Sequence, residues 1–161
     1  MKLQILYLQN NSPKEAKECI NKIIWDEWGR HYTSKQDLES EIEQSFKKES
    51  VSRVFYIIDR NGEIYGTASF LESDLDLFPE INSWLANFYI LEKYRKQGIG
   101  KKLYKEIIEY ARSLGYEYLY LYTTDTSYYS TKRWNIIKNF PYKNKENFLM
   151  QLKLEDEERI S

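Results

Sequence analysis

The segment from Trp84 to Leu114 constrains the fold more than any other part of the chain. It starts with an apolar run typical of a strand, WLANFYIL, continues through the basic stretch EKYRKQGIG, and ends in the helical pattern KKLYKEIIEYARSL. Free N–H groups and the dipole at a helix start favour an anion there. Gly98 and Gly100 carry no Cβ, so a ligand can approach the backbone closely. The segment therefore predicts a strand, a loop and a helix that together bind a phosphate-bearing ligand.

Hydrophobic periodicity predicts further elements on both sides of this unit. Before it we expect a strand, two amphipathic helices and two more strands, over residues 2–8, 13–28, 35–48, 53–58 and 63–71. The unit itself places a strand over 84–90 and a helix over 100–114. After it we expect a strand, a short helix and two strands, over 118–124, 127–133, 134–140 and 148–154.

Local signals refine these boundaries. Ser12 and Ser34 are expected to cap the first two helices, and Asn61-Gly62 predicts a hairpin between two strands. The turn-rich stretch 141–147 is expected to be a loop between the last two strands. Because YLYLYTT from Tyr118 is apolar throughout, its strand is expected at a central position of a sheet.

Length and composition favour one domain over residues 1–161. A chain of 161 residues that is 42% hydrophobic is large enough to bury a full core. Lys plus Arg (24) nearly balances Asp plus Glu (25), so no global field favours nucleic acid or a membrane surface. No apolar run approaches the roughly 20 residues of a membrane span. We expect a cytoplasmic domain without a membrane or nucleic-acid partner, and a frayed acidic tail over 155–161.

The single cysteine and single histidine limit the chemistry further. Cys19 cannot form an intramolecular disulfide, and with His31 it cannot supply a metal site, so no metal is expected. A P-loop is also excluded. It requires Gly-x-x-x-x-Gly-Lys-Ser/Thr, whereas Lys102 follows Gly100-Lys101 and no glycine stands at the required upstream distance.

The stretch Arg95-Lys96-Gln97-Gly98-Ile99-Gly100 resembles the acyl-CoA signature of the GCN5-related N-acetyltransferase (GNAT) superfamily, Arg/Gln-x-x-Gly-x-Gly/Ala between a strand and a long helix. The element order β-αα-β-β-β-α-β-α-β-β is similar to that of the superfamily along almost the whole chain. The resemblance implies a single-domain α/β (α+β) fold. Its centre would be a mixed, mostly antiparallel sheet of about seven strands flanked by helices.

A second anchor lies downstream. Tyr129 to Trp134 fits the spacing of a family motif, Tyr-Glu-Lys-x-Gly-Phe/Trp, with Arg133 in place of the glycine. A left-handed conformation at Arg133 would cost on the order of 1 kcal/mol. The substitution puts the geometry of this turn in question but leaves the tyrosine in place.

The resemblance implies acetyl-CoA as cosubstrate. The pyrophosphate would lie against the N–H groups of residues 97–101, with Arg95 and Lys96 adding charge-assisted contacts. The pantetheine arm would pair with backbone of the fourth strand where that strand splays from the fifth. The expected cofactor-binding residues are Phe88, Tyr89, Ile90, Arg95, Lys96, Gln97, Gly98, Ile99, Gly100 and Lys101.

The implied reaction is direct attack by a primary amine of a small molecule or peptide on the acetyl thioester in a ternary complex. The Ile90 N–H would stabilise the oxyanion, and Tyr129 would donate a proton to the departing thiolate. The neighbouring Tyr128 is the alternative proton donor. The resemblance also allows a homodimer, and it does not identify the amine acceptor.

The general base stays open at this level. Asn87 stands where some relatives carry an acid, and Glu72, Asp74 and Asp76 could act directly or through water. These three acids could instead attract a cationic acceptor or form an ordinary solvated loop. His31 lies where relatives build a wall of the acceptor site, although a structural or exposed role is favoured for a single histidine. Because no base is evident, a non-catalytic acetyl-CoA-binding or protein-interaction module of the same fold remains the alternative.

Overall fold

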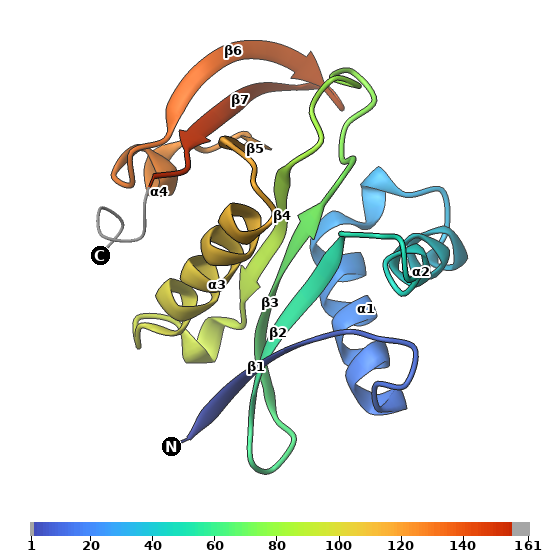
Figure 1. The fold of residues 1–161 in the computed structure, drawn as a ribbon. Coiled ribbons are helices and arrows are strands. Elements are labelled where there is room, and N and C mark those ends of the chain that lie inside the picture. Colours follow the sequence, from blue (N-terminus) through green and yellow to red (C-terminus); the bar gives the residue numbers. More distant parts are fainter. Residues whose placement is uncertain (1, 156–161) are drawn as a thin grey trace.

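The computed structural model describes residues 2–155, and it contains one seven-stranded sheet in the order β1-β2-β3-β4-β5-β7-β6 (Figure 1). Neighbouring strands are antiparallel except β4 and β5, which are parallel. The strands are β1 (Leu3–Tyr7), β2 (Arg53–Asp59), β3 (Ile64–Leu71), β4 (Trp84–Ile90), β5 (Tyr118–Thr123), β6 (Asn135–Tyr142) and β7 (Lys145–Lys153). The helices are α1 (Lys14–Trp28), α2 (Lys35–Gln44), α3 (Ile99–Ser113) and α4 (Ser127–Ser130), with 3₁₀ turns η1 (Gly29–His31) and η2 (Glu92–Tyr94). The predicted α+β fold and element order are confirmed.

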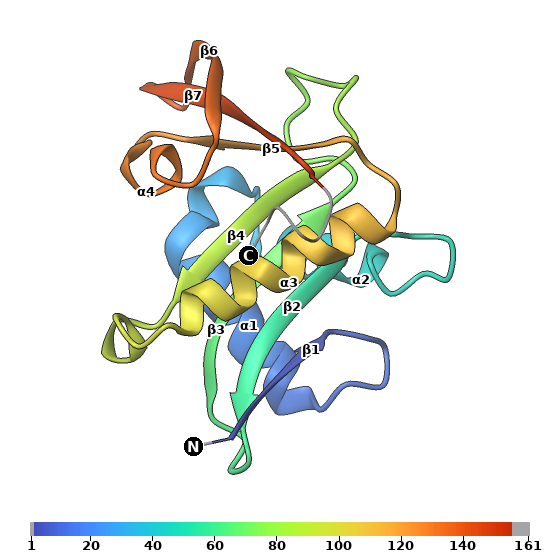
Figure 2. The same cartoon turned by 60° about the vertical axis from the view of Figure 1, so that its left-hand side comes forward.

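Helices cover both faces of the sheet (Figures 1 and 2): α1 and α2 lie on one face and α3 on the other. Strand β2 is covered on both faces, which explains why its residues 54–58 are all apolar. Val54 and Tyr56 pack into the cluster beneath α1 and α2, whereas Phe55 and Ile57 pack into the cluster beneath α3. Successive side chains of a strand point to opposite faces, so a strand covered on both sides needs apolar residues at every position.

A third, smaller cluster fixes the loop between β3 and β4. Leu75 and Ile81 from this loop pack against Trp84, Phe140 and Leu149, which come from β4, β6 and β7. The loop is acidic at its surface but anchored by these apolar side chains. Its carboxylates therefore have defined positions relative to the sheet.

Strands β4 and β5 diverge after a single paired position. Trp84 lies opposite Tyr120, and no other pair is in register between the two strands in the described part of the chain. Toward the carboxyl ends of both strands, a cavity is lined by residues from each of them. The central sheet is therefore split, and β5 pairs fully only with β7.

Several helix boundaries differ from the predictions, and α3 spans Ile99–Ser113 where 100–114 was predicted. α1 begins at Lys14 and not at Pro13, and Ser12 does not cap it, because the Ser12 Oγ accepts the Gln9 N–H at 2.8 Å in the preceding turn. The prediction for Ser34 is confirmed, since its Oγ accepts the Asp37 N–H at 3.1 Å. α2 ends at Gln44, earlier than expected, and there the Ser45 Oγ bonds to the Ile42 carbonyl at 2.6 Å.

The predicted loop over 141–147 is wrong. β6 and β7 form a continuous hairpin closed by Lys143 and Asn144, which have φ values of 52° and 63°, as a two-residue type I′ turn requires. Pro141 is tolerated inside β6 because β6 is an edge strand with one unpaired side. The short helix α4 ends at Ser130 and not at Arg133.

Two further expectations concern the chain ends and membranes. Of the predicted acidic tail, only Glu155 falls in the described part, and 156–161 lie outside it. Within residues 2–155 no helix is long and apolar enough to cross a membrane.

Candidate active site

Backbone groups of β4 face the gap that β5 leaves open. The Leu91 N–H donates to the Tyr65 carbonyl of β3 at 3.0 Å. Because backbone groups alternate along an antiparallel strand, the N–H and C=O of Ile90 point away from β3, toward the gap. Tyr89 lies opposite Thr67, and its backbone points toward β3. The open edge therefore presents Ile90, as expected, whereas the backbone of Tyr89 is used within the sheet.

A bulge at Asn87 shapes the same strand. Thr67 lies opposite Tyr89 and Ser69 opposite Ala86, so two β4 residues, Asn87 and Phe88, face a single residue of β3. Asn87 has a φ of 51°, in the left-handed region that asparagine tolerates better than most residues. Such a bulge bends the strand and redirects its side chains.

The start of α3 meets the requirements of an anion site. Gly98 precedes the helix with a φ of 79°, and no side chain caps the first turn. A Cβ on Gly98 would have no neighbour within 4 Å, so the space beside this residue is open. A Cβ on Gly100 would lie 3.5 Å from Ile90 Cγ1 and 3.7 Å from Phe88 Cζ. The helix start thus packs closely against the open edge of β4.

Arg95 links the loop to this edge. Its Nε donates to the Ile90 carbonyl at 2.8 Å, and its guanidinium lies 5.0 Å from the centre of the Tyr89 ring. Lys96 and Gln97 are exposed, and Lys96 has a φ of 64°. The basic loop is therefore held to β4 by Arg95, while Lys96 faces solvent.

Tyr129, on α4, lines the cavity at the split. Its ring packs edge-on against Trp134 at 5.6 Å and against Tyr128 at 5.1 Å. Burial, with smaller effects from Tyr128 and Tyr104, raises the pKa of Tyr129 above its usual value, so the phenol stays protonated at neutral pH. Tyr128 is 43% exposed and packs on Phe88, outside the cavity lining. The geometry thus distinguishes the two tyrosines.

Arg133 adopts the backbone conformation expected of the glycine it replaces. Its φ is 71°, in the left-handed region, and its Nη1 lies 3.0 Å from Glu155 Oε2. The turn between α4 and β6 is therefore kept despite the substitution.

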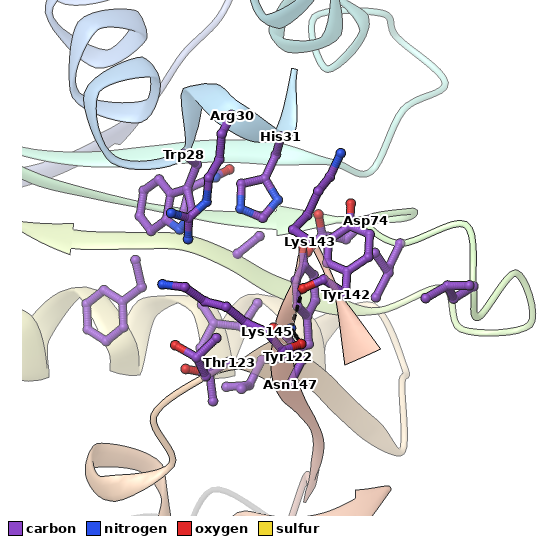
Figure 3. Close-up of a pocket in the computed structure, with 18 of the residues that line it drawn as sticks. Trp28, Arg30, His31, Asp74, Tyr122, Thr123, Tyr142, Lys143, Lys145 and Asn147 are labelled. Carbon is purple, nitrogen blue, oxygen red and sulfur yellow. Dashed lines mark hydrogen bonds between the residues drawn. The ribbon is translucent and has the colours of Figure 1, made fainter. Parts of the chain in front are cut away.

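A cavity of about 680 Å³ lies between the split strands, on the side of α1 and α2 (Figure 3). In Figure 3, Trp28, Arg30 and His31 enter it from one side, and Tyr122, Lys145 and Asn147 enter from the other. Asn87 and Phe88 of β4 and Tyr129 of α4 also line it. The cavity therefore joins the gap beside β4 to the segment that follows α1.

Carboxylates gather on one wall of this cavity. Burial, followed by the nearby Glu41, raises the pKa of Asp74 to about 7. The Tyr32 hydroxyl lies near the Glu41 carboxyl group and the side chain of Asn87 and interacts with both. Asp76 also lines the cavity. A carboxyl group with a pKa near 7 exchanges protons readily at neutral pH, which suits a general base.

The structure separates the candidate bases that the sequence left open. Glu72 does not line the cavity, and its Oε1 accepts the Val51 N–H at 2.9 Å. Asn87 contacts Tyr32 and has no acidic proton to exchange. Asp74 is the one whose carboxyl group combines a place in the cavity with a pKa near neutrality. The three acids of the loop are therefore not equivalent.

His31 belongs to the wall of the cavity. Its ring lies 5.8 Å from that of Tyr142, and its Nδ1 is buried without a hydrogen-bond partner. Burial, with Arg30 and Lys143 nearby, lowers the pKa of His31, so the ring is neutral at pH 7. Trp28 lies edge-on to Tyr89 at 6.4 Å and lines the cavity, whereas Trp25 packs against Gly29 outside it.

Several lining residues were missed by the sequence reasoning. Glu41 is one of four alternating acids in α2, and only the packing of α2 against the sheet singles it out. Lys143 and Lys145 were assigned to a loop, and the tight hairpin carries them to the cavity. The sequence signal for this hairpin was the pair of turn residues, Lys143 and Asn144, and this pair is only a weak match to a type I′ turn.

Comparison with known proteins assigns the chain to a family. A model of the acetyltransferase (GNAT) family matches residues 18–134, which is most of the chain. The protein is thus an acyl-transferring enzyme. It belongs to the GNAT family of acetyltransferases, which take the acetyl group from acetyl-CoA. A search of curated protein sequences finds no match.

Solved structures share the fold at low sequence identity. A GNAT-family acetyltransferase from Staphylococcus aureus is 21% identical, with a TM-score of 0.69, over 96% of this chain and 100% of that one. An aminoglycoside 6'-acetyltransferase type Ii is 18% identical, with a TM-score of 0.73, over 95% and 98% of the two chains. An aminoglycoside 6'-N-acetyltransferase complexed with coenzyme A is 15% identical, with a TM-score of 0.72, over 97% and 98%.

Proposed function

We propose that this protein is an N-acetyltransferase that transfers an acetyl group from acetyl-CoA to a primary amine of a small molecule or peptide, within a ternary complex. One observation carries the proposal: a single cavity brings Asp74 and Tyr129 to the same gap beside β4. A carboxyl group that accepts a proton and a phenol that donates one are the two groups that amine acetylation needs. Similar folds named N-acetyltransferases support nitrogen as the acceptor atom.

The residues around the gap fit acetyl-CoA. The uncapped N–H groups at the start of α3, with Lys96 and Lys101 beside them, would hold the pyrophosphate. Phe88 and Ile90 would flank the pantetheine arm along the open edge of β4, and Gly98 and Gly100 leave room for it. Bound acetyl-CoA supplies an activated acetyl thioester.

Asp74 would begin the reaction by removing a proton from the bound ammonium, directly or through one water. An alkylamine has a pKa near 10, so it is mostly protonated at neutral pH and cannot attack in that form. Because the pKa of Asp74 is about 7, about half of these carboxyl groups are ionised at neutral pH. The ionised form can accept the proton and pass it on to solvent.

The neutral amine then forms the new C–N bond, and the Ile90 N–H donates to the carbonyl oxygen as negative charge develops there. As the C–S bond breaks, the Tyr129 hydroxyl gives its proton to the leaving thiolate. A thiol has a pKa near 8.5, below that of tyrosine, so proton transfer from the phenol to the thiolate is unfavourable between separated groups. The hydroxyl must therefore contact the sulfur for this transfer to assist the reaction. Tyr129 regains a proton from solvent through the cavity.

Two measurements test the proposal. Acetyl-CoA at 100 times its Kd should raise the free energy of unfolding by about 2.7 kcal/mol, seen as a higher melting temperature. A panel of amines should then give acetyl-dependent thiol release with at least one member. Unchanged stability at millimolar acetyl-CoA would contradict the donor site. Binding without thiol release for every amine would instead favour the non-catalytic module.

A further inference from the structure

Gly66 lies inside β3, directly opposite Ile90 of β4. It is buried, and its φ lies outside the left-handed region, so its backbone conformation does not require glycine. A glycine in the interior of a strand weakens the strand, and it often marks a place where another backbone approaches closely. The reason for a glycine at this position is therefore the space around it.

The backbone of β4 occupies the space that a side chain at Gly66 would need. A Cβ there would lie 2.7 Å from the Tyr89 carbonyl oxygen and 3.1 Å from Ile90 Cα, and both of these are backbone atoms. The nearest atom, Ile90 Cδ1 at 2.5 Å, is the end of a flexible side chain and can turn away. β3 and β4 can therefore come this close only because Gly66 has no Cβ.

The Tyr89 carbonyl and the Ile90 N–H belong to one peptide unit, which is planar and rigid. Its carbonyl points toward β3 and its N–H toward the gap. The next peptide unit is fixed at both ends. Its Ile90 carbonyl accepts the Arg95 Nε at 2.8 Å, and its Leu91 N–H donates to the Tyr65 carbonyl at 3.0 Å. A group that displaced the Tyr89 oxygen would therefore rotate the first unit against the second and turn the Ile90 N–H.

We infer that Gly66 is a positioning residue for the oxyanion donor: its missing side chain lets β3 hold the Tyr89–Ile90 peptide with the N–H aimed at the acetyl carbonyl oxygen. The inference rests on the proposed function, in which the Ile90 N–H stabilises the oxyanion. A hydrogen bond weakens steeply when its donor is misaligned, and an oxyanion donor acts through its fixed aim at the developing charge. Gly66 does not touch the acetyl group and acts through this peptide.

Gly66→Ala tests the inference by separating rate from affinity. We expect kcat to fall by about 100-fold, the effect of losing one oxyanion donor. The Kd of coenzyme A should change by less than about threefold, because coenzyme A has no acetyl carbonyl to receive the Ile90 N–H.

Gly115→Ala is the control for a general loss of stability. Gly115 has a φ of 88°, so alanine is costly there, but it follows the far end of α3 from the site. This variant should be less stable to urea and should keep its kcat. An equal fall of kcat in the two variants would overturn the inference.

The carbonyl stretching band of bound acetyl-CoA provides a readout that needs no acceptor. A hydrogen bond to the carbonyl oxygen polarises the C=O bond and lowers its stretching frequency. With acetyl-CoA isotope-labelled at the acetyl carbonyl, infrared difference spectra should show a lowered band on the unaltered protein and a band near that of free acetyl-CoA on Gly66→Ala. This result supports the inference even if no amine is acetylated, in which case only the proposed reaction fails. The same lowered band on both proteins would overturn the inference and leave the proposed reaction standing.

A second background separates the backbone contact from the side-chain contact, and it also serves if Gly66→Ala alone does not fold. Ile90→Val removes Cδ1, the atom nearest to the new methyl group, and leaves the backbone contact at 2.7 Å. We expect Gly66→Ala to abolish the band shift in this background as well. Recovery of the shift and of kcat to the Ile90→Val values would mean that a side-chain clash alone caused the loss, and would overturn the inference.

Discussion

Trp84 of β4 lies opposite Tyr120 of β5, and this is the one position at which the described parts of the two strands keep register. The contact is firmly held. Trp84 is fully buried. The Tyr120 N–H donates to the carbonyl of Ser83, the residue before Trp84, at 3.0 Å. The pair closes one end of the split, so the open edge at Ile90 and the cavity with Asp74 share the gap at the other end.

Replacing Asp74 by asparagine should lower kcat by about 100-fold, because the general base is removed. The rise of kcat/KM with pH that reflects a group with a pKa of about 7 should disappear. Rates are measured from pH 5.5 to 9 with one acceptor. Glu80→Gln, in the same loop but outside the cavity, is the control and should keep the unaltered profile. A pH profile unchanged in the Asp74 variant would show that another group is the base.

The same variant should change how stability depends on pH. Burial raises the folded-state pKa of Asp74 from 3.8 to about 7, so the folded protein binds a proton more tightly than the unfolded chain between these values. Stability from this group is therefore lost as the pH rises from about 4 to 7. Asp74→Asn should gain stability relative to the unaltered protein over that window, as measured by urea unfolding at pH 5 and pH 8. An equal difference at both pH values would mean that the carboxyl group is not desolvated.

Replacing His31 by glutamine should leave the rise of kcat/KM near pH 7 in place. Burial lowers the pKa of His31, so its titration falls below 6.5, outside that part of the profile. The acceptor KM should change more than kcat, because His31 lines the wall and lies against Tyr142. Loss of the rise near pH 7 would instead identify His31 as the titrating group. Comparison with Asp74→Asn in the same buffers provides the reference.

Tyr129→Phe should reduce kcat by about 10-fold to 100-fold while changing the Kd of coenzyme A by less than about twofold. The ring and its contacts with Trp134 are kept, and only the proton donor is lost. Tyr128→Phe is the matched control, because Tyr128 is adjacent but lies outside the cavity lining. A larger loss in the Tyr128 variant would reverse the assignment.

Gly98→Ala and Gly62→Ala should lower the free energy of unfolding by similar amounts, about 1 kcal/mol each. Both glycines have positive φ, 79° and 87°, and in both cases an added Cβ would have no neighbour within 4 Å. Only Gly98→Ala should weaken coenzyme A binding, because Gly98 lies at the helix start where the pyrophosphate is proposed to bind. Equal Kd values for the two variants, measured by calorimetry, would place the pyrophosphate elsewhere.

Much of the fold follows from local patterns in the chain. The strand at Trp84–Ile90 was predicted with its observed bounds, and Ser34 caps α2 as expected. The failures were also local in origin. Ser12 had two available backbone partners and bonded to Gln9, and Pro141 resembled a strand breaker although an edge strand accepts it. The residues next to a position in the sequence do not show which hydrogen-bond partner or which secondary structure the rest of the fold will favour there.

The proposed donor half and the proposed acceptor half of the site differ in how well the sequence alone predicted them. The donor half lies in one continuous segment, where two glycines, a basic loop and a helix start must act together because they are adjacent along the chain. The acceptor half draws Glu41, Asp74 and Lys145 from α2, a loop and β7. Because these residues are far apart in the sequence, the sequence does not show that they line the same cavity. Only the packing of Leu75 against the β6–β7 hairpin, and the split between β4 and β5, brings these charges into one cavity and desolvates Asp74.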